Sequence, residues 1–389
     1  MHGNSIREST LYICLLMFYD LLLCEVFNFN TAIILMGLFA WSFYYVVKVN
    51  QMADVNRVIK ALNWLLILFT IYGVFLVLSH EQLMIDDERK FVNTHYLITI
   101  YNSLLPIYAF YYFSRKRMIT CKTLRRFIPF WILLATLIYF HAQADIRAFL
   151  ADDDSSFTNN AAYLFLSFFP AVVLFNKRVI QYVVIGVILF FVALGVKRGA
   201  IVVSFICLLY YLNWLRKSGH TRIKIRGILA ALVIAVIAGY FFYSFYMSND
   251  YFQLRVEQTI SGNSSNRDTM YSGLLNYYFN QGVVGMIIGN GAASTIRIYG
   301  DSAHNDWLEV LINQGIIGFS VFLVFCYQIV KNWKKINYDT TLKVGFGLFA
   351  IFFLTRTFFS MSYNSIPYYA TAVFGYYLSC IDTRENLKS

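Results

Sequence analysis

The sequence is poor in charge, since Lys, Arg, Asp and Glu make up only 14% of its 389 residues. A soluble domain carries roughly 25% charged residues, so this scarcity argues against a soluble fold. Proline is rare, with four residues, and the chain has no Ser/Gly-rich tract, which argues against disorder. The first apolar run lacks a small-residue cleavage site, so we expect it to remain as a membrane span rather than act as a cleaved signal peptide.

The cysteines predict no disulfide framework. The six cysteines lie in apolar stretches or in one basic loop, and their spacing suggests neither a disulfide scaffold nor a zinc site. We interpret them as small buried apolar residues. They are Cys14, Cys24, Cys121, Cys207, Cys326 and Cys380.

Apolar residues, by contrast, make up 59% of the chain. Runs of about 17–25 apolar residues recur along it, which is the length that crosses the hydrocarbon core of a bilayer. The runs are continuous rather than alternating, so they predict helices, and the fold class is an all-α polytopic membrane protein. Twelve helices are expected, at about 10–27, 31–47, 61–79, 96–113, 127–143, 159–175, 179–196, 200–214, 227–246, 305–329, 341–360 and 366–381.

The net charge of +11 is an orientation signal. Most of the Lys and Arg residues fall in short loops on one side of these helices, and the positive-inside rule then places both termini in the cytoplasm. Nucleic-acid binding is a poor interpretation because the basic residues lie in short loops next to membrane spans. We expect three parts: residues 1–246 with helices one to nine, an extracytoplasmic loop at 247–304, and residues 305–389 with helices ten to twelve and a cytoplasmic C-terminus.

The loop at 247–304 is long enough to suggest a function, and its composition predicts that it is folded. The stretch "SSNRDTMYSGLLNYYF" predicts a short helix capped by Ser265 or Asn266. "GNGAAST" predicts a turn, because Asn-Gly tolerates left-handed backbone angles. The apolar stripe of the short helix would comprise Met270, Leu274, Leu275 and Tyr278.

The stretch "DSAHNDWLEVLINQGIIGF" places polar residues at the mouth of a membrane span. One helical face would present an imidazole at the outer surface and two glycines for close helix packing below it. A second face would carry a polar stripe, which should line a wet cavity. The alternative is a histidine that only caps the helix. The first face comprises His304, Leu308, Leu311, Gly315 and Gly318, and the second Asn305, Glu309 and Asn313.

Several arginines lie on the predicted outer side, against the general trend. Arg198 sits in "GVKRGAI", a tight outer turn between two apolar helices, Arg267 lies at the start of the loop helix, and Arg356 lies inside the outer half of the eleventh span. An arginine in a span suggests a function, although snorkelling to the surface is the alternative. Arginine binds phosphate bidentately, so these residues predict a site for an anionic lipid head group, most simply a diphosphate.

"SAHNDWLEVLINQGIIGF" resembles the histidine–asparagine motif of bacterial O-antigen polymerases and O-antigen ligases. "SNRDTMYSGLLNYYF…GNG" resembles the Arg-led segment that precedes it in that family, and "GVKRGAIV" resembles the Ser-Arg-Gly element, with Lys197 where serine is usual. The resemblance is strongest over about 190–320. It implies a GT-C-like membrane fold with 12 spans and a large outer loop between helices nine and ten.

The activity that the resemblance implies is metal-independent glycosyl transfer from undecaprenyl diphosphate on the outer face of the bacterial inner membrane. The acceptor is another lipid-linked repeat unit in a polymerase, which we favour, or lipid A–core in a ligase. The implied partners are the lipid-linked oligosaccharide, membrane lipid and a chain-length regulator protein, with no cofactor. We assign His304 as general base or diphosphate ligand, Glu309 as its orienting or sugar-binding residue, and the diphosphate to Arg198, Arg267, Arg356 and Asn305.

Two other classes stay open at this point. A metal-dependent glycosyltransferase would need outer carboxylates, and the acidic runs at 85–88 and 152–154 qualify by composition. A transporter or flippase for lipid-linked sugars would need charged or helix-breaking residues at the middle of the membrane in corresponding halves of the chain.

Overall fold

The computed structural model describes residues 2–23, 31–85, 89–150, 161–195, 197–217, 267–337 and 339–385, together with a few isolated residues between 243 and 257. Long helices account for most of them: α1 (His2–Leu23), α2 (Thr31–Asn50), α3 (Arg57–Ser79), α4 (Asn93–Arg115), α5 (Cys121–Leu150), α7 (Arg178–Leu194), α8 (Arg198–Lys217), α14 (Asp306–Lys335), α15 (Thr340–Phe359) and α16 (Tyr368–Glu385). Each coincides with one of the predicted spans. The predicted ninth span, 227–246, lies almost entirely outside the described residues.

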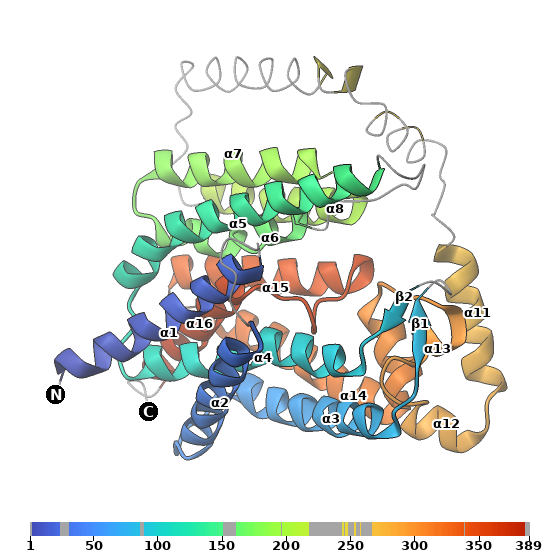
Figure 1. The fold of residues 1–389 in the computed structure, drawn as a ribbon. Helices are drawn as coiled ribbons and strands as arrows, with labels where there is room; N and C mark the ends of the chain where they lie inside the picture. The colour runs from blue at the N-terminus through green and yellow to red at the C-terminus, as the bar shows by residue number, and fades with distance from the viewer. Residues whose placement is uncertain are drawn as a thin grey trace.

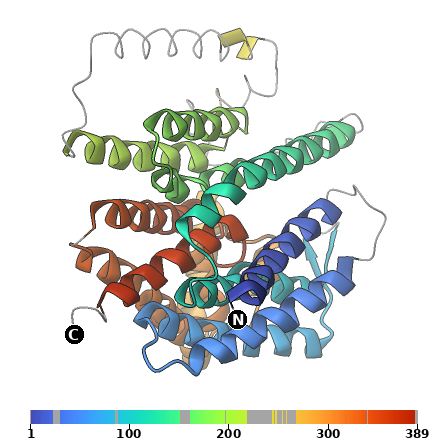
Figure 2. The same cartoon turned by 90° about the vertical axis from the view of Figure 1, so that its left-hand side faces the viewer.

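Shorter elements gather at one end of the molecule. Strands β1 (Leu83–Ile85) and β2 (Arg89–Phe91) pair as an antiparallel hairpin. Helices α11 (Arg267–Asn280), α12 (Val283–Ile288) and α13 (Ser294–Tyr299) precede α14. Figure 1 shows the hairpin and these three helices at the end of the helix bundle opposite to the two chain termini, and Figure 2 shows the layers of the bundle from the side of the termini.

Six described helices are long and apolar enough to cross a membrane. The all-α membrane class is therefore supported, with the small hairpin as the exception that the sequence did not predict. These helices are α2, α3, α5 as far as Ala144, α8, α14 and α15.

The predicted sixth span, 159–175, is broken. It consists of α6 (Ala162–Leu166) and the 3₁₀ helix η1 (Phe169–Leu174), and neither piece is long enough to cross a bilayer. Pro170 has no backbone N–H to donate, and it disfavours helical geometry in the residue before it. Both pieces are buried in the protein, and the Tyr377 hydroxyl donates to the Pro170 carbonyl at 2.7 Å. The expectation of one continuous helix at this place was wrong.

Helix α14 is kinked at Gly315, whose backbone is left-handed with φ 63°. The kink releases two carbonyl groups from the helical hydrogen-bond pattern. The loop after α12 pairs with them, since the Asn290 and Gly291 amides donate to the Ile312 and Asn313 carbonyls at 3.1 and 3.0 Å. The predicted turn therefore exists, with left-handed φ at Gly289 and Gly291, and it fastens the segment that contains α12 and α13 onto α14.

The predicted loop helix is confirmed as α11. Its N-cap falls outside the described residues, but its apolar stripe is buried against α14 and the preceding loop. Leu275 was wrongly included in the stripe, because 38% of it is exposed. The buried cluster comprises Met270, Leu274, Tyr278, Ala303, Leu308 and Ile312.

Segments that the sequence assigns to the inner side also come together. The Asn56 side chain, at the start of α3, donates to the Asp382 carboxylate at 2.6 Å and to the Asn332 amide oxygen at 3.3 Å. These residues belong to the loop before α3 and to the ends of α14 and α16 that the sequence predicts to lie on the inner side. The two hydrogen bonds hold these three segments together.

Candidate active site

The site is built around the start of α14. Asn305 caps this helix: its side-chain oxygen accepts from the Trp307 and Leu308 amides at 3.0 and 3.2 Å. His304 lies just before the cap, outside the helix, with a left-handed φ of 50°. A non-glycine residue in this conformation costs about 1–2 kcal/mol. The expectation that His304 shares a helical face with Leu308 was therefore wrong, and so was the alternative that it caps the helix.

Glu309 holds the segment that carries His304. Its buried carboxylate accepts from the Thr295 hydroxyl at 2.6 Å, the Ala303 amide at 2.8 Å and the Asn313 side chain at 3.2 Å. Both carboxylate oxygens are thus occupied by neighbours from α13, α14 and the intervening loop. Glu309 fixes the backbone next to His304 rather than contacting the imidazole. The predicted polar stripe faces the segment that leads from α13 to His304. Through Glu309 it also faces the cavity described below.

The start of α14 is joined to the end of α15. The Trp307 indole donates to the Thr357 hydroxyl at 2.8 Å, and the Asn305 amide lies 3.5 Å from the Phe358 carbonyl. The buried carboxylate of Asp306 accepts from the Ser362 amide at 2.8 and 2.9 Å. These contacts bring His304 and the last turn of α15 to one place, although about 50 residues separate them in sequence.

Arg356 lies in that last turn and is 3% exposed. One guanidinium nitrogen, Nη2, donates to the Ser365 hydroxyl at 2.7 Å. The guanidinium carbon lies 4.8 Å from the centre of the Tyr163 ring, a cation–π contact. The Nε and Nη1 atoms are buried and have no hydrogen-bond partner among the described residues. Two nitrogen atoms of a buried cation thus lack the hydrogen-bond partner that buried polar groups usually have.

Two further predicted cations lie beside the end of α15. Arg267 approaches the Phe359 carbonyl, with Nη1 3.5 Å from the oxygen. Arg198 begins α8, and the following residue, Gly199, is pressed so tightly against Tyr163 and Phe359 that a β-carbon there would lie 2.4 and 2.5 Å from their atoms. The structure therefore gathers the predicted residues around the last turn of α15.

A cavity of about 840 Å³ opens beside this turn. His304, Glu309 and Arg356 line it, whereas Arg198, Arg267 and Asn305 lie outside its lining. Its walls come from the hairpin, α4, α5, α6, α13 and the loop after α15, all segments that the sequence places on the outer side. Ligand cavities typically measure about 300–1,000 Å³ and are mostly apolar with a few polar groups, and this one matches that description.

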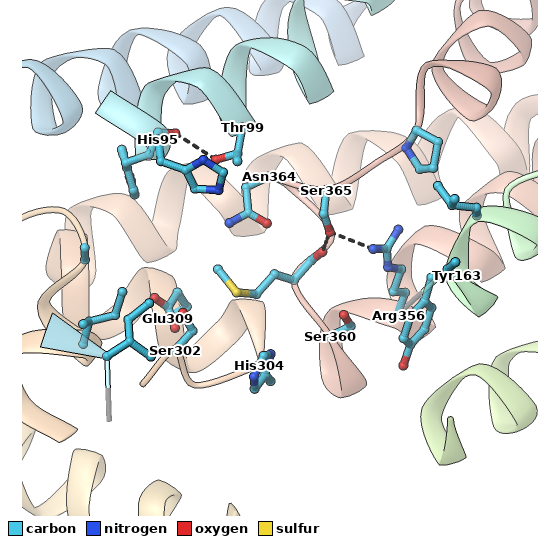
Figure 3. Close-up of a pocket in the computed structure, with 18 of the residues that line it drawn as sticks. His95, Thr99, Tyr163, Ser302, His304, Glu309, Arg356, Ser360, Asn364 and Ser365 are labelled. Carbon is cyan, nitrogen blue, oxygen red and sulfur yellow. Dashed lines mark hydrogen bonds between the residues drawn. The ribbon is translucent and has the colours of Figure 1, made fainter. Parts of the chain in front are cut away.

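Some lining residues were not predicted. The loop after α15 contributes Ser360, Asn364 and Ser365, and α4 contributes His95 (Figure 3). The only signal in the sequence is that this loop, "SMSYNS", is polar between two apolar spans. His95 follows an outer loop in sequence but shows no motif. These residues become recognisable only because the fold brings them to the cavity.

The pKa of His304 lies below its usual value of 6.5, chiefly because its recess is poorly hydrated. The Asp301 carboxylate, 3.8 Å from Nε2, acts in the opposite direction, while the nearby charges of Arg267 and Lys197 lower the pKa further. The imidazole keeps 41% of its side-chain surface exposed, so a substrate can reach it. The lowered pKa favours the neutral imidazole, which is able to accept a proton.

The described residues contain no group of three His, Cys, Asp or Glu side chains placed to hold a metal ion. The acidic run at 152–154 and most of the run at 85–88 lie outside the described residues. No protein-family model matches the chain, and no curated protein matches it.

Proposed function

We propose that the protein is a metal-independent glycosyltransferase of the bacterial inner membrane, an O-antigen or capsular polysaccharide polymerase. It would carry 12 spans in a GT-C-like arrangement, with both termini in the cytoplasm. It would transfer a glycan from undecaprenyl diphosphate to a sugar hydroxyl of another lipid-linked repeat unit on the outer face. The observation that carries the proposal is the buried Arg356, with two unpartnered donors at a cavity that also holds His304.

The chemistry of the donor requires such a cation. When the bond between the anomeric carbon and the diphosphate oxygen breaks, the electron pair leaves with the diphosphate. A preorganised cation in a dry site stabilises that developing charge far better than water does. Arg356 is held in place by Ser365 and Tyr163 before any ligand arrives, and Arg267 adds positive charge nearby.

The attacking hydroxyl needs a base. In the proposed reaction a nitrogen of His304 takes the proton of the acceptor hydroxyl as its oxygen forms the new bond to the anomeric carbon. A neutral imidazole suits this role, whereas a diphosphate ligand would favour a protonated one. The lowered pKa of His304 therefore favours the base assignment. Glu309 acts as a positioning residue through the Ala303 amide.

Glycosyl transfer is favoured over transport by where the charged groups lie. The charged residues that are buried among the described residues are Asp306, Glu309, Arg356 and Asp382, each with at most 6% of its surface exposed. The first three lie near the outer ends of the helices and the last near an inner end. A transporter would place such groups at the middle of the membrane. O-antigen ligase is the alternative within the same chemistry, with lipid A–core as the acceptor.

The test uses the full-length protein in liposomes without any ion gradient. The substrate is the undecaprenyl diphosphate-linked repeat unit extracted from cells that lack this gene, and EDTA is present. We expect longer lipid-linked glycans on a gel and none with His304→Ala. Movement of the lipid-linked unit across the bilayer without elongation would overturn the proposal in favour of a transporter, and loss of elongation in EDTA would overturn its metal-independent form.

A further inference from the structure

The cavity has two chemically different ends. Arg356, Tyr163 and Ser360 lie at one end, with the Ser365 hydroxyl against the guanidinium (Figure 3). His95 and Asn364 are drawn at the other end, where the start of α4 meets the loop after α15. The charged side chains among the described lining residues are Arg356 and Glu309, and the carboxylate of Glu309 is already occupied. The end near His95 thus offers hydrogen bonds without a lysine, arginine or free carboxylate.

The polar groups at this end are available. Neither the imidazole of His95 nor the amide of Asn364 makes a side-chain hydrogen bond to another described residue. An amide carries both donors and an acceptor, and a neutral imidazole carries one of each. Sugar hydroxyls need this combination, because each hydroxyl both donates and accepts. A diphosphate accepts only, so it is better matched by the free donors of Arg356.

The walls near His95 also suit a sugar. The Phe91 ring lies beside the imidazole, with the ring centres 6.3 Å apart, and Ile85 of the paired strand lines the same wall. Aromatic rings offer an apolar face against which the C–H groups of a sugar ring can pack. The hairpin that carries Phe91 is held in turn by Glu81, which forms a two-pronged ion pair with Arg297 of α13.

We propose that His95 and Asn364 form the subsite for the uncharged acceptor sugar, while the Arg356 end binds the diphosphate of the donor. This proposal rests on the proposed function, because it assigns the acceptor substrate of that reaction to one end of the cavity. His304, which lines the same cavity and is drawn below both groups in Figure 3, then removes the proton from the hydroxyl that the subsite presents. The new glycosidic bond forms where the two ends meet, and the diphosphate leaves toward Arg356.

The test separates the two substrates kinetically. The full-length protein in liposomes receives the extracted lipid-linked repeat unit as donor and a soluble benzyl glycoside of the repeat's terminal sugar as acceptor, and each concentration is varied in turn. We expect His95→Ala and Asn364→Ala each to raise the KM for the acceptor about five- to tenfold, the effect of one lost hydrogen bond, with an unchanged KM for the donor. The matched control is Thr94→Ala, one residue away on α4 and outside the cavity lining.

The outcomes distinguish the two proposals. If the unmodified protein transfers glycan but the acceptor KM is the same in both alanine variants, the subsite proposal fails and the proposed function stands. If the donor KM rises instead, His95 and Asn364 belong to the donor site and the assignment is wrong. If the unmodified protein transfers nothing, the proposed function fails and the subsite fails with it.

Discussion

Gly289, which follows α12, meets Gly315 of α14 backbone to backbone. A β-carbon on Gly315 would lie 2.5 Å from the Gly289 nitrogen and 2.5 Å from the Ile287 carbonyl oxygen. Both glycines have left-handed φ angles, 78° and 63°. The contact matters for the site because the same segment continues through α13 to His304. The position of His304 thus depends on two residues without side chains.

Gly315→Ala is expected to destabilise the protein by about 2–5 kcal/mol, from the left-handed backbone and from overpacking. The measurement is the apparent Tm of the purified protein in detergent micelles. Gly186→Ala is the matched control, because a β-carbon there meets nothing within 4 Å in the middle of α7. Its Tm should stay the same or rise. Equal Tm values for the two variants would contradict a tight backbone contact at Gly315.

Arg356→Lys is expected to lower the transfer rate about 10- to 150-fold, as the loss of one charge-assisted hydrogen bond predicts. A lysine keeps the charge but loses the planar fork and its stacking on Tyr163. Initial rates in liposomes provide the measurement, with Arg216→Lys as control. Arg216 lies in the last turn of α8, at the end opposite to Arg198. There it bonds only to Asn213 among the described residues. If Arg356→Lys retained the full rate, a point charge would suffice and the diphosphate would need no fork.

Much of this arrangement follows from the sequence. The apolar runs predict the long helices, and the spacing of apolar residues predicts the stripe of α11, because both signals are local. Met270, Leu274 and Tyr278 do form that buried stripe. The sequence did not predict that Asn305, rather than His304, caps α14.

The remainder depends on contacts between distant residues. Arg356 stacks on Tyr163, which lies almost 200 residues earlier, and the Gly315 kink exists because the loop at 289–291 supplies new hydrogen-bond donors. No local pattern encodes such pairs. For the same reason the sequence showed neither the break at Pro170 nor the polar loop that brings Asn364 to the cavity.

Asp301→Asn is expected to shift the acid limb of the rate–pH profile to lower pH. The base must be neutral, so the rate falls as pH drops through the pKa of His304. The Asp301 carboxylate raises that pKa, and its removal leaves desolvation, Arg267 and Lys197 to lower it further. Arg267→Gln should shift the limb in the opposite direction, to higher pH. Initial rates between pH 5 and 8 provide the measurement, and identical acid limbs in both variants would rule out His304 as the titrating base.

Deletion of the gene should leave the surface lipopolysaccharide with a single repeat unit, because a polymerase joins repeats before they reach lipid A–core. A ligase deletion would leave no repeat on lipid A–core, and polymer would accumulate on its lipid carrier. We expect the first outcome. A ligase must hold the heavily phosphorylated lipid A–core, which calls for free positive charge on the outer side. Arg297, which the sequence also predicts to lie on the outer side, is instead occupied by Glu81 at 2.5 and 2.6 Å.

The measurement is a silver-stained gel of lipopolysaccharide from the deletion strain. Complementation with the unmodified gene should restore the ladder of long chains, and complementation with His304→Ala should not. The variant must first be seen at normal levels in the membrane fraction, so that a missing protein is not mistaken for an inactive one. Full-length polymer on the lipid carrier with none on lipid A–core would identify a ligase and overturn the choice of acceptor, while leaving the roles of Arg356 and His304 in place.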